Sequence, residues 1–89
     1  MSNTKAASND QFLAFRAHMD KDLKDAVEAN LDRFFSSVVL NLADADHGMR
    51  TGNTLARDNS MRHAAELLYG KFHEKTKTIC MVFCTTIED

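Results

Sequence analysis

The chain has 89 residues, of which 44% are hydrophobic, and it carries a formal net charge of −2 with no proline or tryptophan. This length excludes a multidomain enzyme and leaves one small domain, which buries only about 60% of the surface that its unfolded chain exposes. No apolar stretch approaches the roughly 20 residues that cross a bilayer, and residues 1–9 lack the apolar centre of a signal peptide. We therefore expect a cytoplasmic protein. If the gene belongs to a phage, the cytoplasm is that of the infected host cell.

The first helix is predicted to begin beside Ser8, because Ser8 and Gln11 have the spacing of a capping box. We expect residues 1–8 to form a flexible tail and residues 9–89 to form one domain. Apolar residues then recur every three or four positions, as on one buried helix face: Phe12, Phe15, Met19, Leu23, Val27, Leu31, Phe34, Val38 and Leu42. This spacing predicts a helix over about 9–45, roughly 55 Å long. A helix of that length overhangs so small a domain unless it bends, breaks or is covered by another chain.

The pattern changes after Phe34, where Val39 and Leu40 fall on what had been the polar face. Either this part of the helix is covered on all sides, or residues 34–42 form a buried strand. We favour the helix, because the spacing continues without a turn signal. Ser36 and Ser37 are a place where it could bend.

A glycine-containing connection is predicted over 46–53, with Gly48 as a left-handed cap that ends the first helix. A second helix is expected over about 54–74, capped by Asn53 or Thr54. Its buried face has the helical spacing of four, three and four: Met61, Ala65, Leu68 and Phe72. Gly70 leaves open whether this helix breaks there or continues to Lys75.

Residues 76–87 are predicted to form a β-strand, because seven of them are β-branched: Thr76, Thr78, Ile79, Val82, Thr85, Thr86 and Ile87. Ile79 and Met81 belong to the more apolar face of this strand, which should face the helices. A lone strand needs a neighbour for its backbone groups. We therefore expect a homodimer that pairs the two strands around Cys80, Val82 and Cys84, or a partner protein whose sheet edge receives this strand.

The predicted fold class is thus mainly α with one strand (α+β). The alternative is an αβαβ unit, in which residues 34–42 supply a second, parallel strand.

Asp44, Asp46 and His47, followed by Gly48, are the densest set of metal-ligand types in the chain. This segment resembles the magnesium-binding Asp-Gly-Asp-His-Gly loop of the nucleotide-binding subunit of dihydroxyacetone kinases, and the resemblance implies a divalent cation at these residues. It covers about five of the 89 residues. Ala45 stands where that loop has a glycine, and the helical barrel of the family needs a far larger domain.

The remaining histidines and cysteines lack zinc-site spacing. We therefore predict no metal, no cofactor and no enzymatic activity.

The small net charge hides a division along the chain, with −3 over residues 1–49 and +3 over residues 50–77. Four carboxylates on the polar face of the first helix form a candidate protein-binding surface that imitates phosphates: Asp22, Asp25, Glu28 and Asp32. Four basic residues near the second helix are candidates to contact a partner or phosphates: Arg50, Arg57, Arg62 and Lys71.

We expect a non-catalytic protein that binds or inhibits a partner by covering its surface. Phage and mobile-element inhibitors of host systems, such as anti-CRISPR proteins, share this size and lack of motifs, so they are one expected class. The alternative is a small nucleic-acid-binding regulator that uses the basic second helix.

Overall fold

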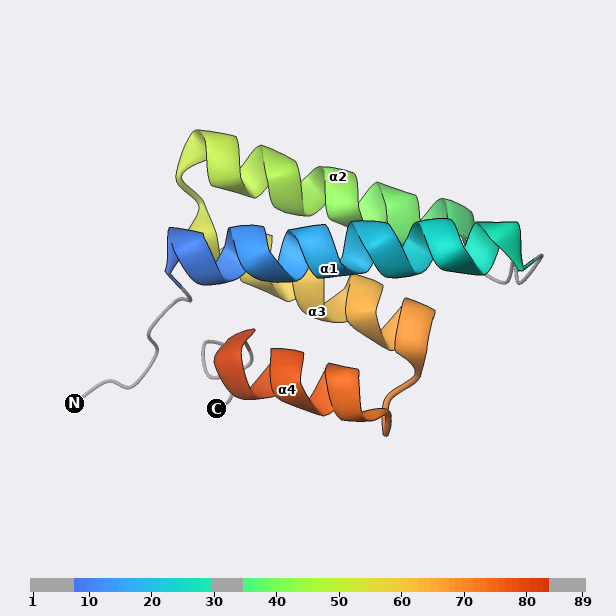
Figure 1. Ribbon diagram of the computed structural model, residues 1–89. Coiled ribbons are helices and arrows are strands. Elements are labelled where there is room, and N and C mark those ends of the chain that lie inside the picture. The colour runs from blue at the N-terminus through green and yellow to red at the C-terminus, as the bar shows by residue number, and fades with distance from the viewer. Residues whose placement is uncertain (1–7, 30–34, 84–89) are drawn as a thin grey trace.

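The computed structural model describes residues 8–29 and 35–83, and these form four α-helices (Figure 1). They are α1 (Asn9–Glu28), α2 (Phe35–Thr51), α3 (Thr54–Tyr69) and α4 (Glu74–Phe83). Successive helices run in opposite directions, and α3 packs against each of the other three. The part of the chain that the structure describes contains no strand, so both the α+β class and the αβαβ alternative are wrong.

Helix α1 begins at the predicted capping box. The Gln11 N–H donates to Ser8 Oγ at 3.1 Å, and the Ser8 N–H donates to Gln11 Oε1 at 2.9 Å. The helix ends at Glu28, so it is about 30 Å long and not 55 Å. The predicted single helix over 9–45 is therefore wrong. Its length required it to bend, to break or to be covered by another chain, and the structure shows two separate helices.

Helices α1 and α2 are antiparallel, so the apolar residues of the two helices face the same core (Figure 1). Phe12 and Met19 of α1 and Val38 and Leu42 of α2 are buried in the same core. The helical interpretation is confirmed for residues 35–42, while the strand is wrong. Leu31 and Phe34 lie outside the described residues. The far end of the α1 stripe is not buried, because Val27 is about half exposed.

The connection between α2 and α3 is only Gly52 and Asn53, because α2 continues through the predicted connection to Thr51. Gly52 has the left-handed conformation, with φ at 80°. Gly48 has a different role from the predicted cap. A Cβ at Gly48 would lie 2.9 Å from both the Arg57 nitrogen and the Asn53 oxygen, so glycine allows α2 and α3 to approach closely. Of the two predicted caps, Asn53 and Thr54, the structure has Asn53, since the Ala56 N–H donates to its Oδ1 at 3.2 Å.

Helix α3 ends at Tyr69, so the predicted helix over 54–74 is too long. Gly70 has φ at 93° and its N–H donates to the Glu66 carbonyl at 2.9 Å, which closes the helix. Phe72 then falls in the turn and is 86% exposed, whereas the helical spacing predicted it to be buried.

Residues 74–83 form helix α4, where the sequence predicted a strand. β-propensity is a weak preference that packing overrides, and this segment also has helical spacing, with Thr76 and Ile79 buried three positions apart. The Thr76 hydroxyl donates to the Ala65 carbonyl of α3 at 3.3 Å. Met81, which was expected to face the helices beside Ile79, is 78% exposed.

The predicted strand pairing loses its basis, because a helix satisfies its own backbone groups. Cys80 and Val82 are half-buried in α4 and form no sheet edge. Cys84 and residues 85–87 lie outside the described residues. The homodimer through this strand is therefore not supported.

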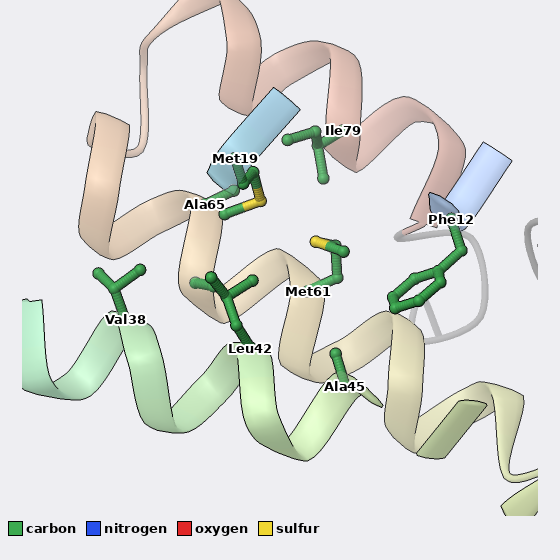
Figure 2. Close-up of a cluster of buried hydrophobic side chains, with 9 residues drawn as sticks. Phe12, Met19, Val38, Leu42, Ala45, Met61, Ala65 and Ile79 are labelled. Carbon is green, nitrogen blue, oxygen red and sulfur yellow. The ribbon is translucent and has the colours of Figure 1, made fainter. Parts of the chain in front are cut away.

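The core is drawn from all four helices (Figure 2). Its buried members are Phe12, Met19, Val38, Leu42, Ala45, Met61, Ala64, Ala65 and Ile79. Leu68 was predicted to lie on the buried face of the second helix, and it is partly buried against this core.

A fully buried ion pair lies beside this core. Arg57 and Asp58 have no exposed side-chain surface, and Arg57 Nε donates to Asp58 Oδ1 at 2.8 Å. Arg57 also donates to Asn9 Oδ1 at 3.0 Å, and its guanidinium carbon lies 5.0 Å from the centroid of the Phe12 ring. Arg57 thus holds the start of α1 against α3.

Candidate functional site

Asp22, the first residue of the predicted acidic surface, is part of an internal contact between three helices. Its carboxylate accepts hydrogen bonds from the Tyr69 hydroxyl of α3 and from Lys75 Nζ of α4, the latter at 2.5 Å. Burial raises the pKa of Asp22, but the hydrogen bonds from Lys75 and Tyr69 outweigh it and hold the pKa below its ordinary value. Burial and the Asp22 carboxylate both raise the pKa of Tyr69. Asp22 therefore holds α1 against α3 and α4.

The other acidic residues do not gather into one surface. Asp25 is exposed and pairs with Lys21 on the next turn, with 3.4 Å between Lys21 Nζ and Asp25 Oδ2. Glu28 is exposed at the end of α1, and Asp32 lies outside the described residues.

The predicted basic surface is also divided. Arg57 is buried, so its assignment to a partner or phosphate surface is wrong. Arg62 is half-buried and donates to Glu66 Oε2 at 3.1 Å and to Asn59 Oδ1 at 3.0 Å. Arg50 and Lys71 are exposed, on α2 and in the turn after α3 respectively.

The candidate cation ligands Asp44, Asp46 and His47 lie within α2 and not in a loop. Asp46 is turned toward α1, where Arg16 donates to both of its oxygens at 3.0 Å. The hydrogen bond to Asp46 raises the pKa of Arg16 and outweighs the opposing effect of burial. Arg16 also pairs with Asp20 on the next turn of α1.

Asp44 and His47 point elsewhere and line a polar groove of about 420 Å³ between α2 and α3, together with Thr51, Asn53 and Ser60. Among the described residues, no three histidine, cysteine or carboxylate side chains are grouped as a cation site requires. The residues that carry the resemblance to the kinase loop are therefore not brought together here.

The first half of α2 has a second apolar face that points away from the core. Val39 and Leu40 are 51% and 66% exposed, Ala43 is exposed and Phe35 is half-buried. We call these four residues the outer face of α2. The sequence predicted that Val39 and Leu40 are covered or lie in a buried strand, and neither is the case within the described residues.

The turn between α3 and α4 carries Phe72, which has the highest exposed fraction of the large hydrophobic residues described. Lys71, beside it, lines a groove of about 390 Å³ with Asn41, His63, Glu66 and Leu67. The start of α2, the end of α3 and the start of α4 lie at the same end of the bundle (Figure 1). The start of α2 and the turn between α3 and α4, which contains Phe72, therefore lie at the same end of the bundle.

Sequence reasoning missed Phe72, because it extended the helical spacing past Gly70. The signal for the correct assignment was Gly70 itself, since a glycine beyond the last apolar position is typical of a helix end. The outer face of α2 was visible as a change in pattern at Val39 and Leu40. What the pattern could not indicate was that none of the residues the structure describes covers these two side chains.

No protein-family model, no curated protein and no solved structure matches this chain. None of the described helices combines the length and apolar character needed to cross a membrane.

Proposed function

We propose that this protein is a non-catalytic binding module that covers part of a partner protein's surface, with the outer face of α2 as the contact. The observation that carries the proposal is the exposure of Val39 and Leu40 on a helix whose opposite face is already buried in the core. Adjacent exposed apolar side chains on a surface helix often mark a site where another protein binds. A partner that covers this face removes apolar surface from water, which is worth about 25 cal/mol per Å².

The arrangement of the charged residues also supports a role in binding. The charged residues that are candidates for chemistry instead hold helices together through three contacts: Asp22 with Lys75, Asp46 with Arg16, and Arg57 with Asn9. The narrower form of the proposal is an inhibitor that covers a surface of a host system, such as an anti-CRISPR protein. The alternative of a nucleic-acid-binding regulator relies on the exposed Arg50 and Lys71, since Arg57 is buried and Arg62 is bound to Glu66.

Photo-crosslinking in the source cell tests the proposal. A photoreactive residue at Leu40 is expected to crosslink one protein, and the same residue at Met81 of α4, which is comparably exposed, is expected not to do so. Leu40→Lys should abolish capture of that protein while leaving the melting temperature unchanged, because the side chain is exposed. Equal crosslinking from both positions, or capture that nuclease treatment removes, would overturn the proposal.

A further inference from the structure

The turn that carries Phe72 is fixed by contacts that its neighbours make on both sides. On one side, the Gly70 N–H donates to the Glu66 carbonyl at 2.9 Å. On the other side, the His73 ring stacks on Tyr69 with centroids 5.5 Å apart, and His73 Nδ1 accepts from the Lys75 N–H at 3.1 Å. These contacts fix the backbone on both sides of Phe72, so the turn presents the ring to water at a defined place along the chain. The backbone of such a turn has little conformational freedom left to lose on binding.

The surroundings of Phe72 are basic. The chain from Gly70 to Thr78 contains three lysines and one glutamate. Lys75 is engaged by Asp22, whereas Lys71 and Lys77 are exposed and form no ion pair with another described residue. Glu66, the acidic residue in the neighbouring groove, is paired with Arg62 at 3.1 Å. Lys71 and Lys77 outnumber the exposed Glu74 of the same stretch, so the surface beside Phe72 carries a small net positive charge within the described residues.

We propose that Phe72 and Lys71 form an anchor for an acidic, amphipathic segment of the partner protein. Phe72 packs against the apolar face of that segment, and the segment's carboxylates lie beside Lys71 and Lys77. An apolar side chain of the segment packs on Leu67 in the groove that Lys71 also lines. This inference rests on the proposed function, because it gives the chemistry of a protein partner that also meets the outer face of α2 at the same end of the bundle (Figure 1).

The surface fits an acidic protein segment better than a lipid bilayer or a nucleic acid. A lysine near an anionic membrane contributes only about 1 kcal/mol, and two lysines with one aromatic ring give weak membrane attachment. Single-stranded nucleic acids are bound along a basic groove in which several aromatic rings stack on successive bases. The other two rings of this turn, Tyr69 and His73, stack on each other, and the groove next to Phe72 is also lined by Glu66.

A matched pair of peptides tests the inference. The probe is a fluorescently labelled peptide of leucine, alanine and glutamate, about 16 residues long so that a helix can form, and its twin has lysine at every glutamate position. Fluorescence anisotropy should show that the glutamate peptide binds the whole protein at least about tenfold more tightly than the lysine peptide. Phe72→Ala should weaken that binding by about tenfold or more, as for an aromatic residue at the centre of an interface.

Three variants separate the anchor from general effects. Lys71→Glu should weaken binding of the glutamate peptide, and Lys71→Arg should restore it. Met81→Ala removes an equally exposed apolar side chain from α4 and should leave binding unchanged. Phe72→Ala should also keep the melting temperature of the wild type, because its side chain is 86% exposed.

Equal binding of the two peptides, no binding of either, or no effect of Phe72→Ala would overturn the inference. Phe72-dependent binding to phosphatidylserine vesicles or to a uridine oligonucleotide, without peptide binding, would replace the protein segment with that ligand. The proposed function is judged separately by the crosslinks from Leu40. If those crosslinks persist while the peptides fail, only the anchor is wrong.

Discussion

Gly48→Ala should destabilise the protein, although alanine is the better helix former. Gly48 lies inside α2, and the new Cβ would be 2.9 Å from the Arg57 nitrogen and from the Asn53 oxygen. Both neighbours are backbone atoms of the start of α3, so no side chain can rotate away. The helices must separate, which strains the hydrogen bond from the Asn53 N–H to the Gly48 carbonyl, now 2.9 Å long.

Two opposing contributions set the size of the effect. Replacing glycine by alanine in a helix interior stabilises by about 1 kcal/mol. Forcing an extra carbon into a packed contact costs about 1–3 kcal/mol, and we expect the upper part of that range here because the contact is with backbone. The net loss is then about 1–2 kcal/mol, which lowers the melting temperature by about 5–15 °C in a domain of this size.

Urea and thermal unfolding followed by circular dichroism measure this loss. Ala43→Gly is the matched control, because Ala43 is exposed on the same helix and reports helix propensity alone. It should lower the free energy of unfolding by about 1 kcal/mol. If Gly48→Ala is as stable as the wild type or more stable, α2 and α3 do not approach as closely as described, and the reasoning fails.

Three further predictions concern the ion pairs and α4. Arg57→Met should reduce the free energy of unfolding, measured by urea titration, by about 3–5 kcal/mol, because it leaves the buried Asp58 carboxylate without this partner. The double variant that also has Asp58→Leu should recover part of the loss. Because the pKa of Asp22 is lower in the folded state than in the unfolded state, its ionised form stabilises the fold above about pH 4, and this stabilisation is lost as the pH falls further. Asp22→Asn should therefore flatten the acid side of a plot of melting temperature against pH, and an unchanged plot contradicts the assignment. Thr78→Ala should raise the melting temperature slightly, since Thr78 is exposed in a helix, whereas in a strand the same change would lower it.

Local rules predicted the starts of α1 and α3, because a cap is a contact within three residues. The capping box of Ser8 and Gln11 was found from its spacing, and Asn53 was one of two candidate caps for α3. Long-range pairs have no such signal. Arg16 and Asp46 are 30 positions apart, and the sequence shows neither that α1 breaks before α2 nor that these two residues then face each other.

The error at residues 76–83 has a different cause. Its β-branched residues favour a strand by propensity, while Thr76 and Ile79 have a spacing that also fits a helix. The decision depends on what lies opposite, and α3 offers the Ala65 carbonyl and an apolar surface to a helix. A single sequence shows the strand propensity of this segment, but it does not show the surface of α3 against which the segment packs as a helix.

The two misplaced apolar sites, Leu40 and Phe72, carry the functional argument. The sequence predicted that both residues are buried, because apolar periodicity indicates residues that avoid water. It does not show which surface buries them. The domain completes its core without either side chain. Large apolar side chains that gather at one end of a small protein promote association. Neither residue has a role in the core, so we place the partner at the end of the bundle where α2 begins and α3 ends.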